Sequence, residues 1–291
     1  GYIGRLESGL GDLGLDCPLL LMMSSGGVTT TGTALREPVR LVESGPAGGA
    51  ILARHIAAEN GLAKVLSFDM GGTTAKICLI KNRAPKTARV FEVARSYRFK
   101  KGSGMPISIP VIDMVEIGAG GGSLARIDAM RQIRVGPESA GSEPGPASYG
   151  RGGTRPAVTD ADLVLGKLDA DNFAGGSIAL HPDCAEAALA ETLGEPLGMD
   201  PVGSAYGLSE VVDENMANAA RVHAVENGED IAAYTMIAFG GAAPLHAARL
   251  CEKLGIDTNQ HVQIQALATQ LEFLELHEVV KNTEKGWIWR G

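Results

Sequence analysis

A strand–turn–strand signal near residue 70 constrains the fold of this chain more than any other feature. Residues 65–68 are Val-Leu-Ser-Phe, residues 69–74 are Asp-Met-Gly-Gly-Thr-Thr, and residues 75–80 again suit a strand. Paired glycines between two strand-forming segments are typical of a tight turn. A turn without side chains lets backbone N–H groups approach a polyphosphate closely. The segment therefore predicts a phosphate-binding hairpin; a plain glycine turn with a capping aspartate stays open as the alternative.

The polar groups of this hairpin have expected roles. A carboxylate can hold Mg²⁺, usually through water that this ion retains, so Asp69 is the expected metal ligand. Backbone N–H groups and threonine hydroxyls can donate to phosphate oxygens. The expected cofactor-binding residues of the hairpin are therefore Gly71, Gly72, Thr73 and Thr74.

A second glycine turn lies about 170 residues further along the chain. Residues 238–246 are Ala-Phe-Gly-Gly-Ala-Ala-Pro-Leu-His, a strand end followed by a double glycine and a helix start. Gly240 and Gly241 would let an adenosine moiety lie against bare backbone, so both are predicted to bind the cofactor. Close packing at a tight strand-to-helix turn is the alternative. A phosphate hairpin followed by an adenosine turn is the plan of sugar kinases, actin and heat-shock ATPases.

The rest of the chain alternates between strand and helix patterns, which predicts an α/β protein. Strands are expected over residues 18–23 and 234–239, and helices over 46–59, with Ser44 as the cap, and 244–254. A long helix is expected from Asp200-Pro201 to Asn227-Gly228. Helical spacing predicts that its core face holds Leu208, Val211, Val212, Met216, Ala219 and Val222.

Residues 102–153 are rich in Gly, Pro and Ser and show little helical periodicity. A stretch of this kind is expected to form a functional loop system. Residues 118–123, Gly-Ala-Gly-Gly-Gly-Ser, do not match a dinucleotide fingerprint and are predicted to line the active cleft instead. Glu138 and Asp160 are candidate catalytic carboxylates that could orient water or a metal ion, with solvated loop acids as the alternative. His223 is expected to be a hydrogen-bonded core histidine rather than a catalytic one.

Charge and cysteine spacing exclude several classes. The formal net charge is −8 and no long basic run is present, which argues against nucleic acid as a partner. The apolar run at residues 19–23 is far too short to cross a bilayer, and no secretion signal opens the chain. The spacing of Cys17, Cys78, Cys184 and Cys251 supports neither a zinc site nor a disulfide framework, and favours the cytoplasm.

From about residue 19 to 256 the sequence resembles the hydantoinase A/5-oxoprolinase family, which includes the A subunit of N-methylhydantoinase and related acetone and acetophenone carboxylases. The stretches that carry the resemblance occur in order along the chain: residues 24–27, 44–49, 69–74, 117–123, 135–141, 144–150, 158–163 and 238–246.

The resemblance implies an actin-like ATPase fold of the ribonuclease H-like class, here partial and with the Gly/Pro-rich region inserted. It implies ATP and Mg²⁺ as cofactors and ATP-dependent hydrolysis of a cyclic amide of the hydantoin or 5-oxoproline type. Asp69 is the third candidate catalytic carboxylate, beside Glu138 and Asp160. An ATP-dependent ketone carboxylase subunit and a non-catalytic fragment are the alternatives. A B-type hydantoinase subunit is the implied partner.

The chain also departs from the family pattern. The first Asp-x-Gly-Gly-Thr hairpin of the family is absent, so residues 1–256 are expected to form an A-type domain without its amino-terminal lobe, inactive in isolation. Lys76 stands where many relatives have Asp, and Ser148 where many have Cys. Residues 257–291 are expected to form an atypical tail with a helical stretch over 263–280.

Overall fold

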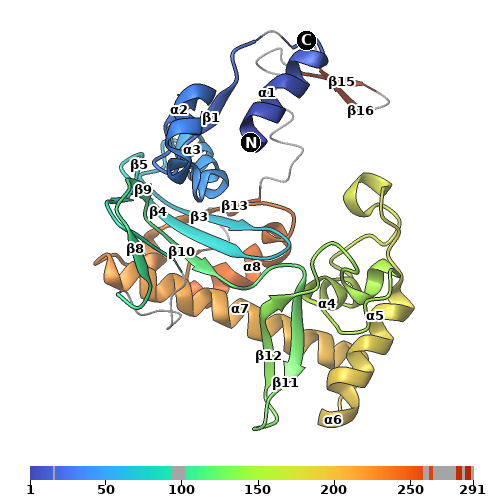
Figure 1. Ribbon diagram of the computed structural model, residues 1–291. Helices are drawn as coiled ribbons and strands as arrows, with labels where there is room; N and C mark the ends of the chain where they lie inside the picture. Colours follow the sequence, from blue (N-terminus) through green and yellow to red (C-terminus); the bar gives the residue numbers. More distant parts are fainter. Residues whose placement is uncertain (16, 94–101, 258–261, 265–279, 284–285, 290–291) are drawn as a thin grey trace. The chain divides into compact units, whose positions relative to one another are not determined.

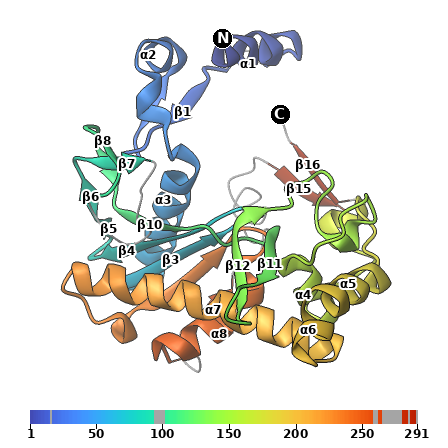
Figure 2. The ribbon, with the colours of Figure 1, turned by 60° about the horizontal axis from the view of Figure 1, so that its bottom comes forward.

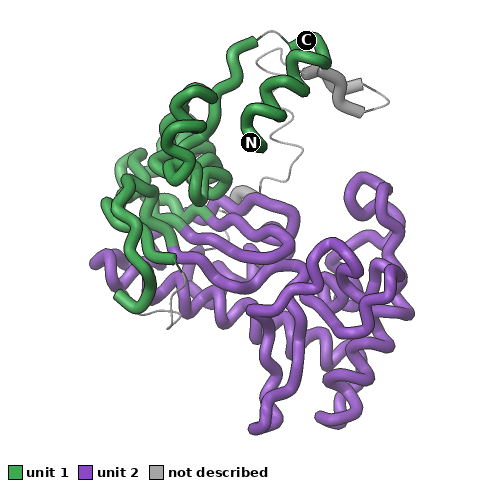
Figure 3. The backbone as a smooth tube through the Cα atoms, in the orientation of Figure 1, with its two compact units in different colours: residues 1–67, 78–114 green, residues 68–77, 115–291 purple. Residues whose placement is uncertain are grey.

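The computed structural model of the chain describes residues 1–15, 17–93, 102–257, 262–264, 280–283 and 286–289 (Figure 1). The chain divides into two units, residues 1–67 with 78–114 and residues 68–77 with 115–291 (Figure 3). Strands β3, β4 and β10 each contribute residues to both units. The two units are described one at a time below.

The main sheet has the strand order β10-β4-β3-β13-β14, and β5 pairs with β4 in addition. Strands β3 (Lys64–Met70) and β4 (Ala75–Lys81) are neighbours joined by the glycine turn, which confirms the predicted strand–turn–strand unit. Strand β13 (Thr235–Phe239) is buried at all five positions and runs parallel to β14 (Val262–Ile264). Strand β13 thus lies between β3, which is distant in the sequence, and β14, which is the next strand after α8.

Apart from helices α1 and α3, the helices and strands of the first unit are short. Its helices and strands are α1 (Tyr2–Asp12), β1 (Leu20–Met22), β2 (Val28–Thr30), α2 (Thr31–Arg36), a 3₁₀ turn (Pro38–Leu41), α3 (Ser44–Glu59), β5 (Ala84–Pro85), β6 (Thr87–Ala88), β7 (Phe91–Val93), β8 (Met105–Ile107) and β9 (Val111–Ile112). Helix α3 was predicted, but Glu43 and not Ser44 precedes its first residue, with a left-handed φ of 61°. The stop is as expected: Asn60 ends α3, and Gly61 takes a positive φ of 66°.

The second unit carries the longer helices, which lie below the sheet and beside it in Figure 2. Its elements include β10 (Met114–Ile117), β11 (Ser123–Ile127), β12 (Ile133–Ser139), α4 (Val158–Val164), α5 (Pro182–Leu189), a π-helical turn (Ala190–Gly194), α6 (Glu195–Leu197), α7 (Pro201–Glu226), α8 (Ala243–Leu254), β15 (Val280–Thr283) and β16 (Gly286–Trp289). Short 3₁₀ turns cover Ala147–Tyr149, Phe173–Gly176 and Ile231–Ala233. Helix α8 packs on β13 and β14, and α7 packs on α8, α4 and α5.

The predicted long helix is confirmed as α7, and the Asp200 side chain accepts a hydrogen bond from the Gly203 N–H, as expected of a cap. Its core face was predicted only in part. Leu208, Val212, Met216 and Ala219 are buried, but Val222 is 39% exposed and Val211 is only half-buried. Buried polar side chains, among them Ser209 and Asp213, occupy part of this face instead.

Two expectations for irregular regions need correction. Residues 102–153 contain strands β8 to β12 and are not one loop system, because their backbones pair in ladders such as β11 with β12. The helix expected over residues 263–280 lies almost entirely outside the described residues, and Gln263 and Ile264 belong to strand β14. The α/β class is confirmed, whereas the actin-like assignment stays a prediction.

Candidate active site

The turn between β3 and β4 is held by a glycine-rich loop that follows β10. The Gly121 N–H donates to the Gly71 carbonyl at 2.9 Å, and the Gly122 N–H donates to the Gly72 carbonyl at 2.7 Å. A Cβ at Gly120 would lie 2.5 Å from the Thr73 nitrogen, so only glycine permits this approach. These bonds occupy the carbonyls of Gly71 and Gly72, and the Gly71 N–H closes the turn by donating to the Thr74 carbonyl at 3.2 Å. No group of the described residues accepts a hydrogen bond from the N–H of Gly72 or Thr73.

The second glycine turn lies against the end of β3. The Ala242 N–H donates to the Met70 carbonyl at 3.0 Å. Gly240 has a φ of +92°, and a Cβ there would lie 2.6 Å from the Met70 oxygen and 2.7 Å from an Asp69 carboxylate oxygen. The two turns are therefore in direct contact although about 170 residues separate them in the sequence.

A cavity of about 720 Å³ opens between these turns and helix α4, within the second unit. Parts of both turns line it, as does the 118–123 loop, which was predicted to line a cleft. A Cβ added at Gly71, Gly72 or Gly241 would meet nothing within 4 Å, so bare backbone faces open space at each of these positions. The lining residues are Gly71, Gly72, Thr73, Gly121, Gly122, Gly141, Ser142, Pro146, Tyr149, Thr159, Asp162, Lys167, Leu168, Asp169, Asn172, Phe173, Ala174, Gly241, Ala242 and Leu245.

One part of the cavity wall lies at the start of helix α8. It is lined by Gly241 and Ala242, which precede the helix, and by Leu245 of its first turn. The Ala242 N–H donates to the Met70 carbonyl, the Leu245 N–H donates to the Ala242 carbonyl, and Pro244 has no N–H, so these groups are not available to a ligand and the helix dipole is what favours an anion here. The rings of Tyr149 and Phe173, with centroids 5.8 Å apart, also line the cavity. The cavity thus combines a helix amino terminus with an aromatic pair.

Asp69 lies at the edge of this arrangement and does not itself line the cavity. Burial raises the pKa of its carboxyl, and the charge of Lys76 lowers it by less. Lys76 donates to the Thr74 hydroxyl at 2.8 Å and lies 3.2 Å from Glu116. The lysine at this position is thus engaged with the hairpin itself.

Asp160 is fully buried, and its carboxylate accepts three backbone hydrogen bonds. The donors are the N–H groups of Ala147 at 3.1 Å, Ser148 at 2.7 Å and Ala157 at 2.7 Å. The bond from Ala157 closes the first turn of α4, as a carboxylate at this helix position often does. Asp160 therefore holds the backbone at residues 147–148 and at residue 157 together beside the cavity.

Glu138 lies on the surface and does not line the cavity. Its carboxylate accepts two hydrogen bonds from the Arg155 guanidinium, at 3.0 and 2.5 Å. The bonds from Arg155 hold the pKa of Glu138 below its ordinary value. The structure therefore does not bring Glu138 together with the two glycine turns.

A buried charge cluster, not foreseen from the sequence, borders the cavity. His246 of α8 is fully buried, with Nδ1 2.8 Å from an Asp213 oxygen of α7 and Nε2 3.2 Å from an Asp162 oxygen of α4. Burial alone would lower the pKa of His246, but its bonds to the two carboxylates outweigh that effect and raise the pKa to about 9. Asp162 also accepts from Lys167 Nζ at 3.0 Å. The imidazole is therefore a cation at neutral pH.

The family of the chain follows from comparison with known proteins. A family model described as hydantoinase/oxoprolinase matches residues 1–271. The chain belongs to the hydantoinase/oxoprolinase family. The match spans both glycine turns and every residue that lines the cavity.

Three relatives show the range of this family. The chain is 40% identical over 260 residues to an uncharacterized protein of Methanocaldococcus jannaschii, covering 88% of the chain and 38% of that protein. It is 36% identical to the caprolactamase subunit alpha of Pseudomonas jessenii, covering 87% and 35%. A nucleotide-free structure of acetone carboxylase, whose title describes ATP-dependent acetone carboxylation, superimposes with a TM-score of 0.77 at 27% identity, covering 87% and 34%. The chain thus spans little more than a third of the length of these relatives.

The buried charge cluster around His246 was not predicted for this hydantoinase/oxoprolinase chain, although the sequence contains signals for it. Asp213 interrupts the apolar stripe of α7 between Val212 and Met216, and a carboxylate on a core face needs a buried partner. His246 is the last residue of the 238–246 stretch and lies in the first turn of α8. What the sequence could not supply is that α4 brings Asp162 to the same imidazole.

The described residues contain no group of three or more His, Cys, Asp or Glu side chains that could hold a metal ion. None of their helices is long and apolar enough to span a membrane. All four cysteines are free thiols, with Cys78 and Cys251 buried.

Proposed function

We propose that the cavity binds ATP and that the chain serves the ATP-dependent hydrolysis of a cyclic amide of the hydantoin or 5-oxoproline type. One observation carries this proposal: two glycine turns, far apart in sequence, meet at a single cavity and expose bare backbone to it. Such surfaces suit the phosphates and the flat sugar and base of a nucleotide. The caprolactamase relative supports the amide chemistry.

In this proposal the residues of the chain bind and position. The N–H groups of Gly72 and Thr73 and the hydroxyls of Thr73 and Thr74 donate to the phosphates, and Gly71 leaves room for them. Gly240 and Gly241 leave room for the adenosine moiety. Transfer of the γ-phosphoryl group from ATP to the amide oxygen releases ADP and makes the ring carbon electrophilic. Water adds to that carbon, the ring C–N bond breaks to give a carboxylate and an amine, and phosphate is released. Catalysis of phosphoryl transfer consists mainly of positioning and charge neutralisation, which preorganised backbone donors supply. The role we propose for Asp160 is to fix the start of α4 beside the bound ligand, and for Glu138 to hold Arg155 at the rim of this region.

Mg²⁺ fits this site through Asp69. The ion needs only one or two carboxylates because it keeps water and binds phosphate oxygens. Asp69 offers a partly desolvated carboxylate in contact with both turns, as its approach to Gly240 shows. When bound, the ion would neutralise charge on the transferred phosphoryl group. Asp69 is thus the proposed metal ligand and the proposed catalytic carboxylate of the hairpin.

An ATP-dependent ketone carboxylase subunit is the second candidate function. The likeness to acetone carboxylase, with a TM-score of 0.77, favours it specifically. A B-type hydantoinase subunit is the proposed partner, and the free thiols are consistent with the cytoplasm as the proposed location. Both candidates use the same nucleotide cavity and differ in the second substrate.

The test is a coupled assay of ADP release by the chain combined with its B-type partner. We expect ATP turnover that depends on a cyclic amide, and an Asp69→Asn variant that is slower by about 100-fold or more, as for loss of an electrostatic catalytic group. Asn has nearly the same shape as Asp and carries no charge, and burial disfavours the charge of Asp69, so the variant should still fold. Asp183→Asn, at the exposed start of α5, is the matched control.

Each other outcome of this assay has a defined meaning. Turnover only with a ketone and bicarbonate would select the carboxylase function. Near-normal turnover by Asp69→Asn would remove Asp69 from the mechanism.

A further inference from the structure

Lys167 is the one basic side chain among the described residues that line the cavity; the other charged lining residues are Asp162 and Asp169. Its ammonium group donates to Asp162 at 3.0 Å and to the Ser209 hydroxyl at 2.9 Å. An ammonium group carries three N–H donors, so one remains for a ligand. The side chain is 27% exposed, in agreement with its place in the cavity wall.

The backbone places this lysine with little freedom. Helix α4 ends in a Schellman motif: the Gly166 N–H donates to the Leu163 carbonyl at 3.0 Å, and the Lys167 N–H donates to the Asp162 carbonyl at 2.9 Å. Gly166 supplies the left-handed φ of +71° that this motif needs. Asp162 therefore holds Lys167 twice, by its carbonyl and by its carboxylate.

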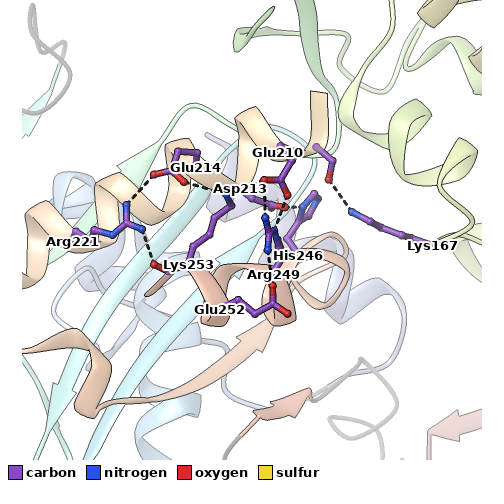
Figure 4. A network of polar contacts seen from close by, with 10 residues as sticks. Lys167, Glu210, Asp213, Glu214, Arg221, His246, Arg249, Glu252 and Lys253 are labelled. Carbon is purple, nitrogen blue, oxygen red and sulfur yellow. Dashed lines mark hydrogen bonds and ion pairs between the residues drawn. The ribbon is translucent and has the colours of Figure 1, made fainter. Parts of the chain in front are cut away.

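The charge of His246 affects how strongly this region repels an anion. A protonated His246 together with Lys167 balances Asp162 and Asp213, so these four side chains are formally neutral, and Asp169 in the cavity lining adds one formal negative charge. With a neutral imidazole, the same four side chains would carry one net negative charge and would repel phosphate. His246 Nδ1 is hydrogen-bonded to Asp213 of α7 and its Nε2 is ion-paired with Asp162 of α4, and both carboxylates favour the imidazolium form. Figure 4 shows Lys167, Asp213 and His246 together with the neighbouring ion pairs.

We propose that Lys167 binds a phosphate of the nucleotide in the cavity, and that Asp162, Ser209 and His246 are positioning residues that hold its ammonium group. This inference rests on the proposed nucleotide function. It gives the nucleotide site a positively charged side chain, which neither glycine turn provides. A cation held by fixed partners loses little conformational entropy when the ligand arrives, which strengthens binding.

The experiment is a calorimetric titration of the full chain with ADP and, separately, with adenosine. For Lys167→Met we expect ADP affinity to fall by about 10- to 100-fold, the range of a charge-assisted hydrogen bond, and adenosine affinity to change by less than about 2-fold. Lys253→Met is the matched control, because Lys253 belongs to the same unit, lies outside the cavity lining and pairs with Glu210. Its ADP affinity should equal that of the wild type.

Positioning is tested through Ser209→Ala, a small change on α7 that leaves the ion pairs of Asp162 in place. It should weaken ADP binding by about 3- to 5-fold, as for one neutral hydrogen bond, and have no further effect in a Lys167→Met background. A merely structural role would instead give equal effects in both backgrounds.

The failures of the two proposals are distinguishable. A wild-type chain that binds neither ADP nor adenosine contradicts the nucleotide function itself. A wild-type chain that binds ADP, with unchanged affinity in Lys167→Met, overturns the role of Lys167 alone. Equal losses for ADP and adenosine would also overturn it, since they would indicate damage to the cavity rather than loss of a phosphate contact.

Discussion

Among single residues, His246 combines complete burial with a full charge. Such a charge is tolerated only where carboxylates surround it, and Asp162 and Asp213 provide them on two sides. The pKa of Asp162 shows the same coupling: burial would raise it, but the bonds from His246 and Lys167 lower it. The three helices that carry these residues are therefore joined by charge as well as by apolar packing.

This arrangement predicts a loss of stability in mildly alkaline solution. The pKa of His246 is raised from 6.5 to about 9 in the folded chain, so its stabilising effect is complete below pH 6.5 and disappears as pH rises to about 9. The loss should be on the order of 3 kcal/mol, since one pKa unit corresponds to about 1.4 kcal/mol. Denaturant unfolding across this pH range measures it.

The controls for this prediction are two histidine variants. His55→Asn, on the exposed side of α3, should keep the pH dependence, because no buried carboxylate pair depends on it. His246→Asn should be less stable at pH 6.5 and should lack the slope between pH 6.5 and about 9. A wild-type free energy of unfolding that stays constant over this range would contradict the charge assigned to His246.

The sequence predicted which residues lie at or near the site better than it predicted what their side chains contact. The glycines of both turns were found because their spacing is a local signal, and both turns border the cavity or contact its wall. Asp160 was chosen as a carboxylate in a glycine-rich region, but its three backbone donors come from residues up to 13 positions away. Glu138 was chosen on the same ground and pairs with Arg155, 17 positions away. Such contacts depend on the folded backbone and leave no local pattern.

At the scale of elements, helices α7 and α8 are joined by an ion-pair network (Figure 4). Glu210 accepts two bonds from Arg249, at 2.7 and 2.9 Å, and one from Lys253 at 3.0 Å. Glu214 accepts from Lys253 at 3.1 Å and from Arg221 at 3.0 Å. The bonds from Arg249 and Lys253 lower the pKa of Glu210 to about 2. The network lies outside the cavity lining and joins the two helices to each other.

Removing the centre of the network should loosen the helix pair. Glu210→Gln is expected to cost about 1 kcal/mol in the free energy of unfolding, more at low than at high ionic strength. The contribution of the wild-type carboxylate is present above pH 4.5 and is lost as pH falls toward about 2. Glu186→Gln, on the exposed side of α5, serves as the control. Equal, salt-independent effects of the two variants would show that the network contributes nothing.

Elements were predictable where local signals were strong. Asp200-Pro201 and Asn227-Gly228 bound α7 as expected, and Gly255 ends α8 with a φ of +71°. The core face of α7 was less predictable, because Asp213 and Ser209 are buried by partners on α8 and after α4, while Val222 is left partly exposed. Strands β8 to β12 were not predicted: β8, β9 and β10 have four residues or fewer, and β12 contains Gly136 and Pro137, which disfavour a strand in sequence.

At the scale of the whole chain, the central claim is that the two glycine turns form one nucleotide site. Variants of Gly240 and Gly241 distinguish an effect on folding from an effect on nucleotide binding. A Cβ at Gly241 meets open space, whereas Gly240 has a positive φ and lies against the Met70 carbonyl. Gly240→Val should therefore unfold at a lower temperature, by several degrees, from backbone strain alone. Gly241→Val should fold normally and project its side chain where the adenosine moiety would lie.

The most direct test is a calorimetric titration of ADP into the wild-type chain, Gly241→Val and Gly32→Val, with the melting temperature of each. Gly32 also has open space around it, but it lies in α2, outside the second unit. The account predicts saturable ADP binding by the wild type and by Gly32→Val, and binding at least about 10-fold weaker in Gly241→Val at an unchanged melting temperature. Absence of ADP binding by the wild type, or equal affinity in Gly241→Val, would contradict it.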